Sequence, residues 1–342
     1  MKIERLLKKL TEAYGPSGEE ELVSSVVEDM TSARADRVFK DKLGNLFVEK
    51  DGPAPKIMVA AHMDEIGVII THLDEQGFLR LAPVGGISPY RLVGQRLRFK
   101  NGNRGVVFHE KVKEWKELDW SKLYLDIGQK DNKSAQEIIR IGDMACLDQP
   151  FLTLSGGRFV AKAMDNRSGC AILIEAITQL PDNLPQAVCF VFSVQEELGL
   201  RGAKTAAYRC EPDYGLAVDV TGVGDTPQAP LSNISLGKGP VIKVKDRSVM
   251  CHPLIKQFMQ ETAEKNEIPY QLGVVERGGT DAGAIHTSRE GVPSGVLSIP
   301  CRYVHSPSEM IDSVDLRHST DLLVKLLTAK WPAPEGQVCH EK

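Results

Sequence analysis

Two neighbouring glutamates, Glu196 and Glu197, closely follow an apolar run of strand length, Ala187 to Ser193. The run is rich in β-branched and aromatic residues and lies between Pro185 and Gly199, which is typical of a strand buried on both faces. Burying an ionised carboxylate without a partner is very costly in free energy. A pair of carboxylates at the end of a buried strand therefore indicates a bound cation, although a solvated loop would explain the pair on its own.

Histidines and acids follow other predicted strands in the same way. The runs from Lys56 to Ala61, from Tyr214 to Val218 and from Gly295 to Ile299 all lead into such residues. In open α/β sheets, ligands bind beyond the carboxyl ends of the strands, so side chains at these ends are expected to converge. Imidazole and carboxylate donors without thiolates suit zinc, cobalt or manganese. The residues that we expect to converge are His62, Asp64, Asp165, Glu196, Glu197, Asp219 and His305.

Each of these residues also has a structural explanation when it is taken alone. Asp165 has the position of a helix N-cap, Asp219 that of a turn residue and His305 that of a loop histidine. His62 and Asp64 are two residues apart and face the same way in an extended segment, so the carboxylate can orient the ring of a ligating histidine. The metal site is favoured because the separate explanations would all have to hold at successive strand ends.

Length and composition are those of an ordinary soluble protein with one large domain or two. The chain has 342 residues, of which 42% are hydrophobic and 26% charged, and its net charge is −4. This charge gives no reason to expect nucleic acid or an anionic membrane as a partner, and no apolar run has the length of a membrane span. The start of the chain is unlike a secretion signal, and the seven cysteines form no CxxC pair. We therefore expect a cytoplasmic protein with free, buried thiols.

The elements that must hold these side chains follow from the pattern of strands and helices. Strand and helix runs alternate over 1–66 and 157–342, which predicts an α/β catalytic domain with a mostly parallel sheet and helices on both faces. Between them, 67–156 contains short strand-length runs separated by glycine turns, which predicts an inserted all-β, barrel-like domain that acts as a lid or in oligomerisation. Near the start, Ser17 and Glu20 have the spacing of a capping box that opens a helix.

Six stretches of the sequence combine the candidate ligands with glycines and small residues in a fixed order. They are AHMDEIG (61–67), AMDNRSG (163–169), VQEELGLRGA (194–203), AVDVT (217–221), GGTDAGAIH (278–286) and RYVHSPSEM (302–310). Together they closely resemble the tetrahedral aminopeptidases, the forty-second family of metallopeptidases, which includes glutamyl and deblocking aminopeptidases. The resemblance extends over nearly the whole chain, and six ordered motifs are far more specific than any one of them.

The resemblance implies two divalent metal ions in each subunit. Zinc is the first choice for these ions, and cobalt and manganese are alternatives. Such a site would hydrolyse N-terminal residues from short peptides. The family forms hollow tetrahedral dodecamers built from dimers, so the resemblance also implies a homo-oligomer. The implied roles are His62 and Asp219 for one ion, Glu197 and His305 for the other, Asp165 as the bridge, Glu196 as the general base and Asp64 as the residue that orients His62.

Two further surfaces have candidate residues. Arg277, Asp281 and Arg302 lie near the ligand loops in the sequence and are our candidates for the substrate pocket. Trp115 and Trp120 stand in a charged stretch of the insert and are candidate interface anchors, unless both pack inside the insert.

Three other functions are compatible with parts of this pattern. A related dinuclear amidohydrolase, a carboxypeptidase or an N-deacylase, would use the same site, and a carboxypeptidase would need a cation for the substrate carboxylate. A glycoside hydrolase such as an endoglucanase would use paired carboxylates without histidine ligands. A non-catalytic scaffold would not need the general base. Chelation separates the glycosidase from the metal enzymes, and N-acetylated peptides separate an aminopeptidase from the other amidohydrolases.

Overall fold

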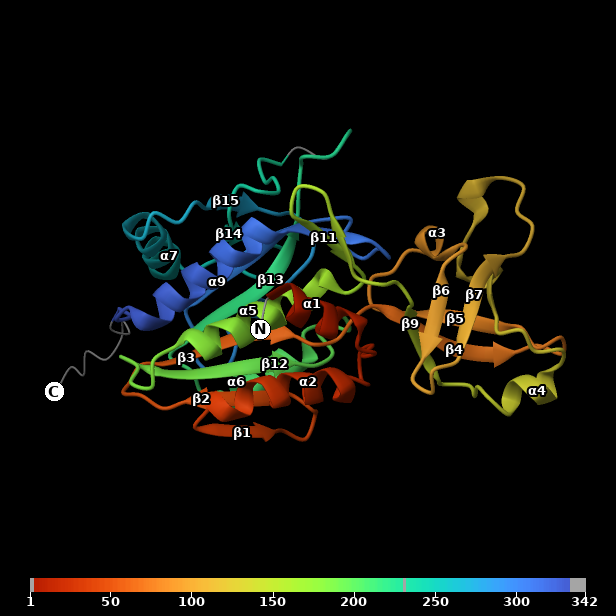
Figure 1. Cartoon of the computed structure of the whole chain (residues 1–342), viewed down its shortest axis with the longest axis horizontal. Helices are drawn as coiled ribbons and strands as arrows, with labels where there is room; N and C mark the ends of the chain where they lie inside the picture. The colour runs from red at the N-terminus through yellow and green to blue at the C-terminus, as the bar shows by residue number, and fades with distance from the viewer. Residues whose placement is uncertain (1–2, 230–231, 333–342) are drawn as a thin grey trace.

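The computed structural model describes residues 3–229 and 232–332, which form two parts that lie next to each other (Figure 1). One part is built on an eleven-stranded sheet with helices packed against it, and the other is a closed barrel of six strands. The barrel lies at one end of the molecule, apart from the large sheet (Figure 1). The predicted fold class, an α/β domain with an inserted all-β barrel, is confirmed.

Four parallel strands form the centre of the large sheet. They lie side by side in the order β12 (Ala187–Ser193), β3 (Lys56–His62), β13 (Tyr214–Gly222) and β16 (Ser294–Arg302). Nearly all of their residues are buried, as expected for strands covered on both faces. β13 is longer than the apolar run that predicted it, so Asp219 lies inside the strand rather than after it. The parallel arrangement brings the carboxyl ends of the four strands to one edge of the sheet.

The flanking strands make the sheet a mixed one. On one side of the centre, β2 and β1 continue the sheet antiparallel, and on the other side β17, β11 and β10 do the same. β14 pairs antiparallel with β16 and parallel with β15. The mostly parallel arrangement that the sequence predicts is therefore found at the centre. The flanking strands are β1 (Arg37–Lys40), β2 (Leu46–Lys50), β10 (Leu152–Leu154), β11 (Arg158–Ala161), β14 (Val241–Lys245), β15 (Gln271–Val274) and β17 (Glu309–Asp312).

Helices cover both faces of the large sheet. Because side chains alternate along β3, Ile57, Val59 and Ala61 belong to one apolar cluster, and Met58 and Ala60 belong to another. The first cluster includes residues of α1 (Ile3–Glu12), α2 (Glu21–Thr31), α5 (Met164–Gln179), α7 (Pro253–Lys265) and α9 (Ser313–Thr328), and the second includes residues of α6 (Arg201–Cys210) and α8 (Ala282–Ile285). A 3-10 turn, η1 (Ser32–Arg34), follows α2. α5 is buried along most of its length, including the residues at its start, Met164 to Ser168.

The capping box predicted at Ser17 and Glu20 is wrong. Helix α2 does begin after Glu20, but no side chain caps its first turn. Ser17 Oγ instead donates a hydrogen bond to Asp64 Oδ2 at 2.6 Å, and Glu20 Oε1 accepts from the backbone N–H groups of Gly18 and Gln195. Both side chains therefore bind polar groups of the loops at the strand ends. These groups compete with the first turn of α2 for the same side chains, and here the loops have them.

Three buried charged side chains, Glu65, Lys162 and Arg167, lie together where the insert begins and ends. Lys162 Nζ lies 2.6 Å from each carboxylate oxygen of Glu65, and Arg167 Nη2 lies 3.3 Å from Glu65 Oε1. All three side chains are almost inaccessible to solvent. Glu65 stands just before the first barrel strand, and Lys162 directly follows β11. The pair therefore joins the two ends of a long excursion of the chain.

The barrel closes through six antiparallel strands around an aliphatic core. Its last strand ends at Leu147, and β10, which lies before the expected boundary at 156, belongs to the large sheet. In order around the barrel, the strands are β4 (Gly67–Leu73), β5 (Leu79–Val84), β8 (Leu123–Asp126), β7 (Arg104–His109), β6 (Arg96–Phe99) and β9 (Met144–Leu147). Between them lie α3 (Pro89–Leu92), α4 (Asn132–Gln136) and the 3-10 turns η2 (Trp115–Glu117) and η3 (Trp120–Lys122).

The two tryptophans of the barrel have different surroundings. Trp120 packs against the barrel core. Trp115 is 53% exposed, and its ring lies against the rings of Tyr90 and His109 of the same module. Trp120 thus packs inside the insert, and Trp115 remains available at the surface.

Two expectations about the environment of the chain can be compared with the described residues. Their six cysteines are free and buried, as predicted, and Cys339 lies outside the described range. None of the helices in the described part of the chain has the length and apolar character that crossing a bilayer requires.

Candidate metal centre

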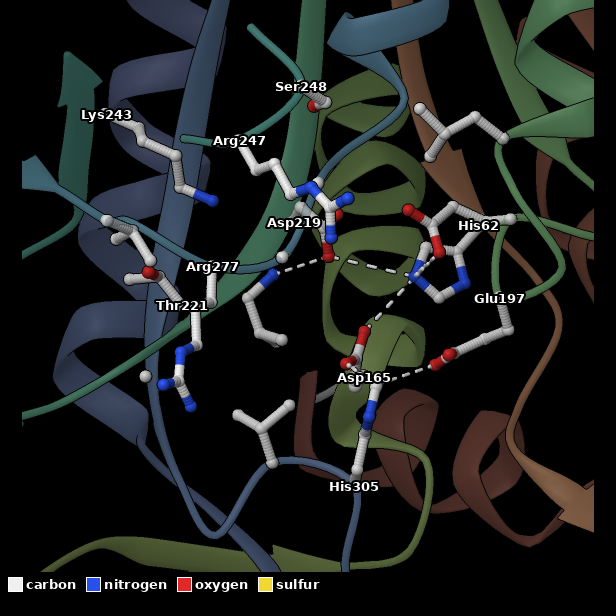
Figure 2. A pocket seen from close by; sticks show the side chains of 18 of the residues that line it. His62, Asp165, Glu197, Asp219, Thr221, Lys243, Arg247, Ser248, Arg277 and His305 are labelled. Carbon is white, nitrogen blue, oxygen red and sulfur yellow. Dashed lines mark hydrogen bonds and ion pairs between the residues drawn. The ribbon is translucent and has the colours of Figure 1, made fainter. Parts of the chain in front are cut away.

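Two groups of potential metal donors meet at the carboxyl edge of the central strands (Figure 2). Within each group the donor atoms lie within 4.8 Å of one another. Asp165 connects the groups, because its Oδ1 lies 3.1 Å from His62 Nε2 and its Oδ2 lies 3.3 Å from His305 Nε2. The first group is His62, Glu196 and Asp219, and the second is Asp165, Glu197 and His305. The six residues that the sequence predicted as ligands and base therefore converge.

Asp165 lies at a kink near the start of α5, where its own backbone and that of Asn166 depart from helical angles. The regular helix follows the kink, and its first turn is capped by Asn166, whose Oδ1 accepts the backbone N–H of Gly169 at 3.1 Å. The backbone N–H of Asp165 donates to Glu309 Oε2 at 2.9 Å, and the next residue, Asn166, donates from its side chain to the carbonyl of Val218 on β13. The carboxylate of Asp165 is thereby left facing the two histidines.

Asp64 organises the ends of two strands. Its carboxylate accepts the backbone N–H groups of Glu196 at 2.9 Å and Glu197 at 3.1 Å. His62 Nδ1 lies 3.1 Å from the backbone carbonyl of Asp64 and 3.5 Å from its Oδ1. A proton on Nδ1 would be held by these oxygens, which leaves the lone pair of Nε2 directed at Asp165 and the other donors.

Glu309 is a site residue that the sequence analysis missed. Its Oε1 accepts the backbone N–H of His305 at 2.7 Å, while its Oε2 binds Asp165, so one buried carboxylate fixes two donors. Burial, together with the charge of Asp165, raises the pKa of Glu309 to about 8. Glu309 lies four residues after His305 in a quoted motif, but nothing in its spacing distinguishes it from a surface glutamate.

The negative charges of the clustered carboxylates are of the kind that bound cations balance. Burial raises the pKa of Asp219 to about 8, and burial together with the nearby carboxylates raises the pKa of Glu196 well above its usual value. Burial alone would lower the pKa of His62, but Glu196 and Asp165 raise it well above the usual value. Four clustered carboxylates and two imidazoles without a thiolate fit two divalent ions of the zinc, cobalt or manganese type, whose charge would balance the carboxylates.

Comparison with known proteins identifies the family. The M42 glutamyl aminopeptidase family matches residues 44–322, a span that contains both donor groups. The chain belongs to the M42 family. It is therefore a peptidase of the aminopeptidase type, and the resemblance seen in the six sequence motifs is confirmed.

The likeness to known aminopeptidases and peptidases extends over both parts of the fold. Lysyl aminopeptidase of Pyrococcus furiosus is 39% identical, over 96% of this chain and 97% of its own. Aminopeptidase APDkam598 of the archaeon Desulfurococcus kamchatkensis superposes with a TM-score of 0.94 at 37% identity, over 98% of both chains. The Pyrococcus horikoshii TET1 peptidase, which can assemble into a tetrahedron or a large octahedral shell, superposes with a TM-score of 0.87 at 35% identity, over 95% of this chain and 99% of its own.

A cavity of about 550 Å³ opens beside the donor groups of this M42 protein, and cations line part of its wall. In Figure 2, Lys243, Arg247 and Arg277 lie across the cavity from Glu197 and His305. Lys243 is buried, with its Nζ 3.7 Å from a carboxylate oxygen of Asp246. The guanidinium groups of Arg247 and Arg277 form no hydrogen bond or ion pair with any residue of 3–229 or 232–332. Two arginines without a partner among the described residues thus face the cavity beside the two donor groups.

Of the three predicted pocket residues, only Arg277 lines this cavity. Asp281 accepts a hydrogen bond from Ser193 Oγ beneath the site, and Arg302 forms two hydrogen bonds with Asp225, at 2.8 and 2.9 Å. β16 continues through Arg302, which carries this side chain away from the cavity. The sequence analysis missed Arg247, although its position shortly after β14 is again a strand end.

Proposed function

We propose that this chain is a metal-dependent aminopeptidase that releases N-terminal residues from short peptides at a site with two divalent ions per subunit. The observation that carries the proposal is the pair of donor groups that Asp165 connects, one of its oxygens facing each histidine. Zinc is our first choice, and cobalt and manganese also suit nitrogen and oxygen donors.

In the proposed arrangement, His62 and Asp219 hold one ion, Glu197 and His305 hold the other, and Asp165 bridges them. Glu196 keeps the separate role of general base that the sequence motifs imply. Its Oε2 lies 4.0 Å from His62 Nε2, farther than the nearest oxygens of Asp165 at 3.1 Å and Asp219 at 3.8 Å. Asp64, which accepts the N–H groups of both glutamates, would keep the two carboxylates and the ring of His62 in place.

Two bound cations would polarise the scissile carbonyl and lower the pKa of the attacking water. The side chain of Glu196 is 12% exposed, so it can reach water in the cavity while it remains shielded from bulk solvent. Glu196 would take a proton from the attacking water and pass it to the leaving amino group. A carboxylate shielded in this way can hold the proton between the two steps.

The cavity wall supports a preference for an acidic N-terminal residue. Unpaired guanidinium groups bind carboxylates through strong, charge-assisted hydrogen bonds. Burial raises the pKa of Asp219, and the charge of nearby Lys243 offsets part of this rise. The cations therefore lie next to the donor groups, where the first residue of a bound peptide would lie. A lysyl side chain would be repelled by Arg247 and Arg277. The same arginines could instead bind the terminal carboxylate of a dipeptide, and substrates without that carboxylate separate the two cases.

We also propose that the chain forms a cytoplasmic homo-oligomer, dimers that assemble into a tetrahedral dodecamer. The P. horikoshii TET1 peptidase, similar over nearly the whole chain, supports the assembly. The free buried thiols of the described cysteines support a reducing compartment. Enclosure in such a shell would limit the substrates to short peptides that can enter.

Chelation and blocked substrates test the reaction. Dialysis against a chelator should abolish hydrolysis of a free tripeptide, and zinc or cobalt should restore it, because the donors hold the ions reversibly. The N-acetylated form of the same tripeptide should resist cleavage. Equal cleavage of both forms would contradict the aminopeptidase function, and full activity after chelation would contradict the metal dependence.

A further inference from the structure

The barrel reaches the second donor group from outside the α/β domain. His305 Nδ1 lies 3.2 Å from the backbone carbonyl of Gly86, the second residue after the barrel strand β5. Arg91 of α3 donates from a single nitrogen, Nη1, to the carbonyls of Val304 at 2.5 Å and His305 at 2.8 Å. In Figure 1, α3 lies on the side of the barrel that faces the large sheet. These contacts join parts of the chain more than 200 residues apart in sequence.

The approach of the barrel is close enough to require glycine. A Cβ atom on Gly86 would lie 2.7 Å from His305 Nδ1, closer than side chains pack. A Cβ atom on Gly85, which has a φ of +77°, would lie 3.1 Å from Glu197 Oε2. The backbone of the barrel is therefore packed directly against two of the three donors in the second group.

The loop that carries His305 depends on such support. Tyr303 and His305 have φ angles of +61° and +60°, a conformation that L-residues adopt only where their surroundings hold it. The side chain of His305 is 31% exposed, whereas that of His62 is 1% exposed. The second group thus relies on a strained and partly exposed ligand.

The first donor group is held by other parts of the chain. His62 Nδ1 faces the carbonyl of Asp64, and Asp219 Oδ1 accepts the N–H of Val220 within β13. Both donors lie on neighbouring strands, β3 and β13, of the large sheet. The geometry of the first donor group is therefore set by strand pairing, whereas contacts with the barrel set the geometry of the second group.

We propose that the barrel is a structural part of the second metal site, with Gly86 and Arg91 as the residues that position His305. The carbonyl of Gly86 holds the Nδ1 proton of His305 and so directs Nε2 toward Glu197 Oε1, 3.0 Å away, and Arg91 holds the loop in place. Loss of the barrel contacts weakens the binding of the ion held by Glu197 and His305 and leaves the ion held by His62 and Asp219 in place. This inference rests on the proposed function with two metal ions.

Replacement of Arg91 tests the inference. Arg91→Met removes both hydrogen bonds from an exposed side chain, so the variant should fold, which its melting curve would check. Zinc bound per subunit, and the affinity of each site by titration against a competing chelator, are measured. We expect one of the two affinities to fall about 10–100-fold, the usual effect of losing a group that orients a ligand. Diffraction at the zinc absorption edge should show the lost ion on the His305 side.

Three further variants complete the test. Arg104→Met removes a barrel arginine that pairs with Asp148 of the same module, and it should leave both affinities unchanged. Arg91→Lys should recover part of the loss, because both original bonds come from one nitrogen. Gly86→Ala should weaken the same ion as Arg91→Met, since the added methyl group displaces the ring of His305.

Several results would overturn the inference. It fails if wild-type protein binds two ions and Arg91→Met and Gly86→Ala bind both with unchanged affinity. It also fails if both sites weaken equally, because the barrel would then support the fold as a whole. A wild-type protein that binds a single ion would overturn the proposed function with two ions, and the inference with it.

Discussion

At the scale of single residues, the two adjacent glutamates show how neighbours can have different tasks. The N–H groups of both bind the carboxylate of Asp64, yet Glu196 faces His62 at 4.0 Å and Glu197 faces His305 at 3.0 Å. Gln195, just before them, has a φ of +52° that turns the chain at the end of β12. The turn lets one carboxylate belong to each donor group.

The first prediction separates their roles. Glu196→Gln should keep both metal ions while kcat falls about 10²–10⁴-fold, because the amide cannot accept the proton from water. Glu197→Gln should instead lose affinity for one ion, because an amide oxygen is a weaker ligand than a carboxylate. Metal analysis and steady-state kinetics on both variants provide the check. Equal loss of metal from the two variants would show that the roles are not divided in this way.

The second prediction concerns the arginines of the cavity. Wild-type enzyme should prefer glutamyl- over leucyl-nitroanilide, substrates that have no terminal carboxylate. Arg247→Met and Arg277→Met should each lower the ratio of the two kcat/KM values about tenfold to a hundredfold, the worth of a charge-assisted hydrogen bond. Arg302→Met is the matched control and should leave the ratio unchanged, because Arg302 is engaged with Asp225. A wild-type preference for leucyl substrate would exclude the acidic pocket.

At the scale of elements, the central strands could be predicted because each is a continuous apolar run. Most of the donors could be predicted because they stand at the ends of those runs, whereas Asp165 stands near the start of α5. The sequence pattern failed where a residue serves a distant partner. Ser17 and Glu20 fit a local capping pattern, yet both bind loops at the far strand ends. Gly86 and Arg91 act on His305 across a domain boundary, and no periodicity of the sequence reports such a contact.

The third prediction uses Glu20, which links the start of α2 to the turn after β12. Burial raises the pKa of this carboxyl to about 7, and the charge of Asp64 contributes. Because the unfolded chain ionises near 4.5, charging Glu20 in the folded state costs stability as the pH rises from 4.5 to 7, and the cost is complete above 7. Below 4.5 the cost is absent, since both states bind the proton.

Glu20→Gln removes this cost and keeps the acceptor, because both N–H groups bind the same oxygen, Oε1. The variant should gain up to about 3 kcal/mol over wild type at pH 8, the equivalent of a pKa raised from 4.5 to about 7, and no such gain at pH 4. Urea unfolding at several pH values measures the difference. A gain that does not change with pH would show that another property of the variant is responsible.

At the scale of the whole molecule, the barrel is both a neighbour of the active site and an exposed surface. Trp115 and Phe108 are about half exposed on it, a setting in which aromatic side chains often anchor interfaces. The catalytic domain and the barrel together match the TET1 peptidase over nearly its full length. We therefore expect the proposed assembly to involve both the catalytic domain and the barrel.

The fourth prediction is the mass of that assembly. Light scattering at micromolar concentration with zinc present should give twelve times the 37.6 kDa of one chain. Trp115→Ala should shift the distribution toward smaller species if the exposed ring lies in an interface, and Trp120→Ala reports the effect of loosening the barrel core instead. A wild-type protein that remains monomeric under these conditions would contradict the proposed oligomer.

The buried pair of Glu65 and Lys162 has a consequence for the order in which the chain folds. The two residues are 97 positions apart, and closing a flexible loop of that length costs about 4 kcal/mol in chain entropy. The barrel, however, brings its own ends together, since Gly67 pairs with Cys146. If the barrel folds first, only the stretch after Leu147 remains to be closed. The pairing of Glu65 with Lys162 then requires the closure of a short loop, although the two residues are far apart in the sequence.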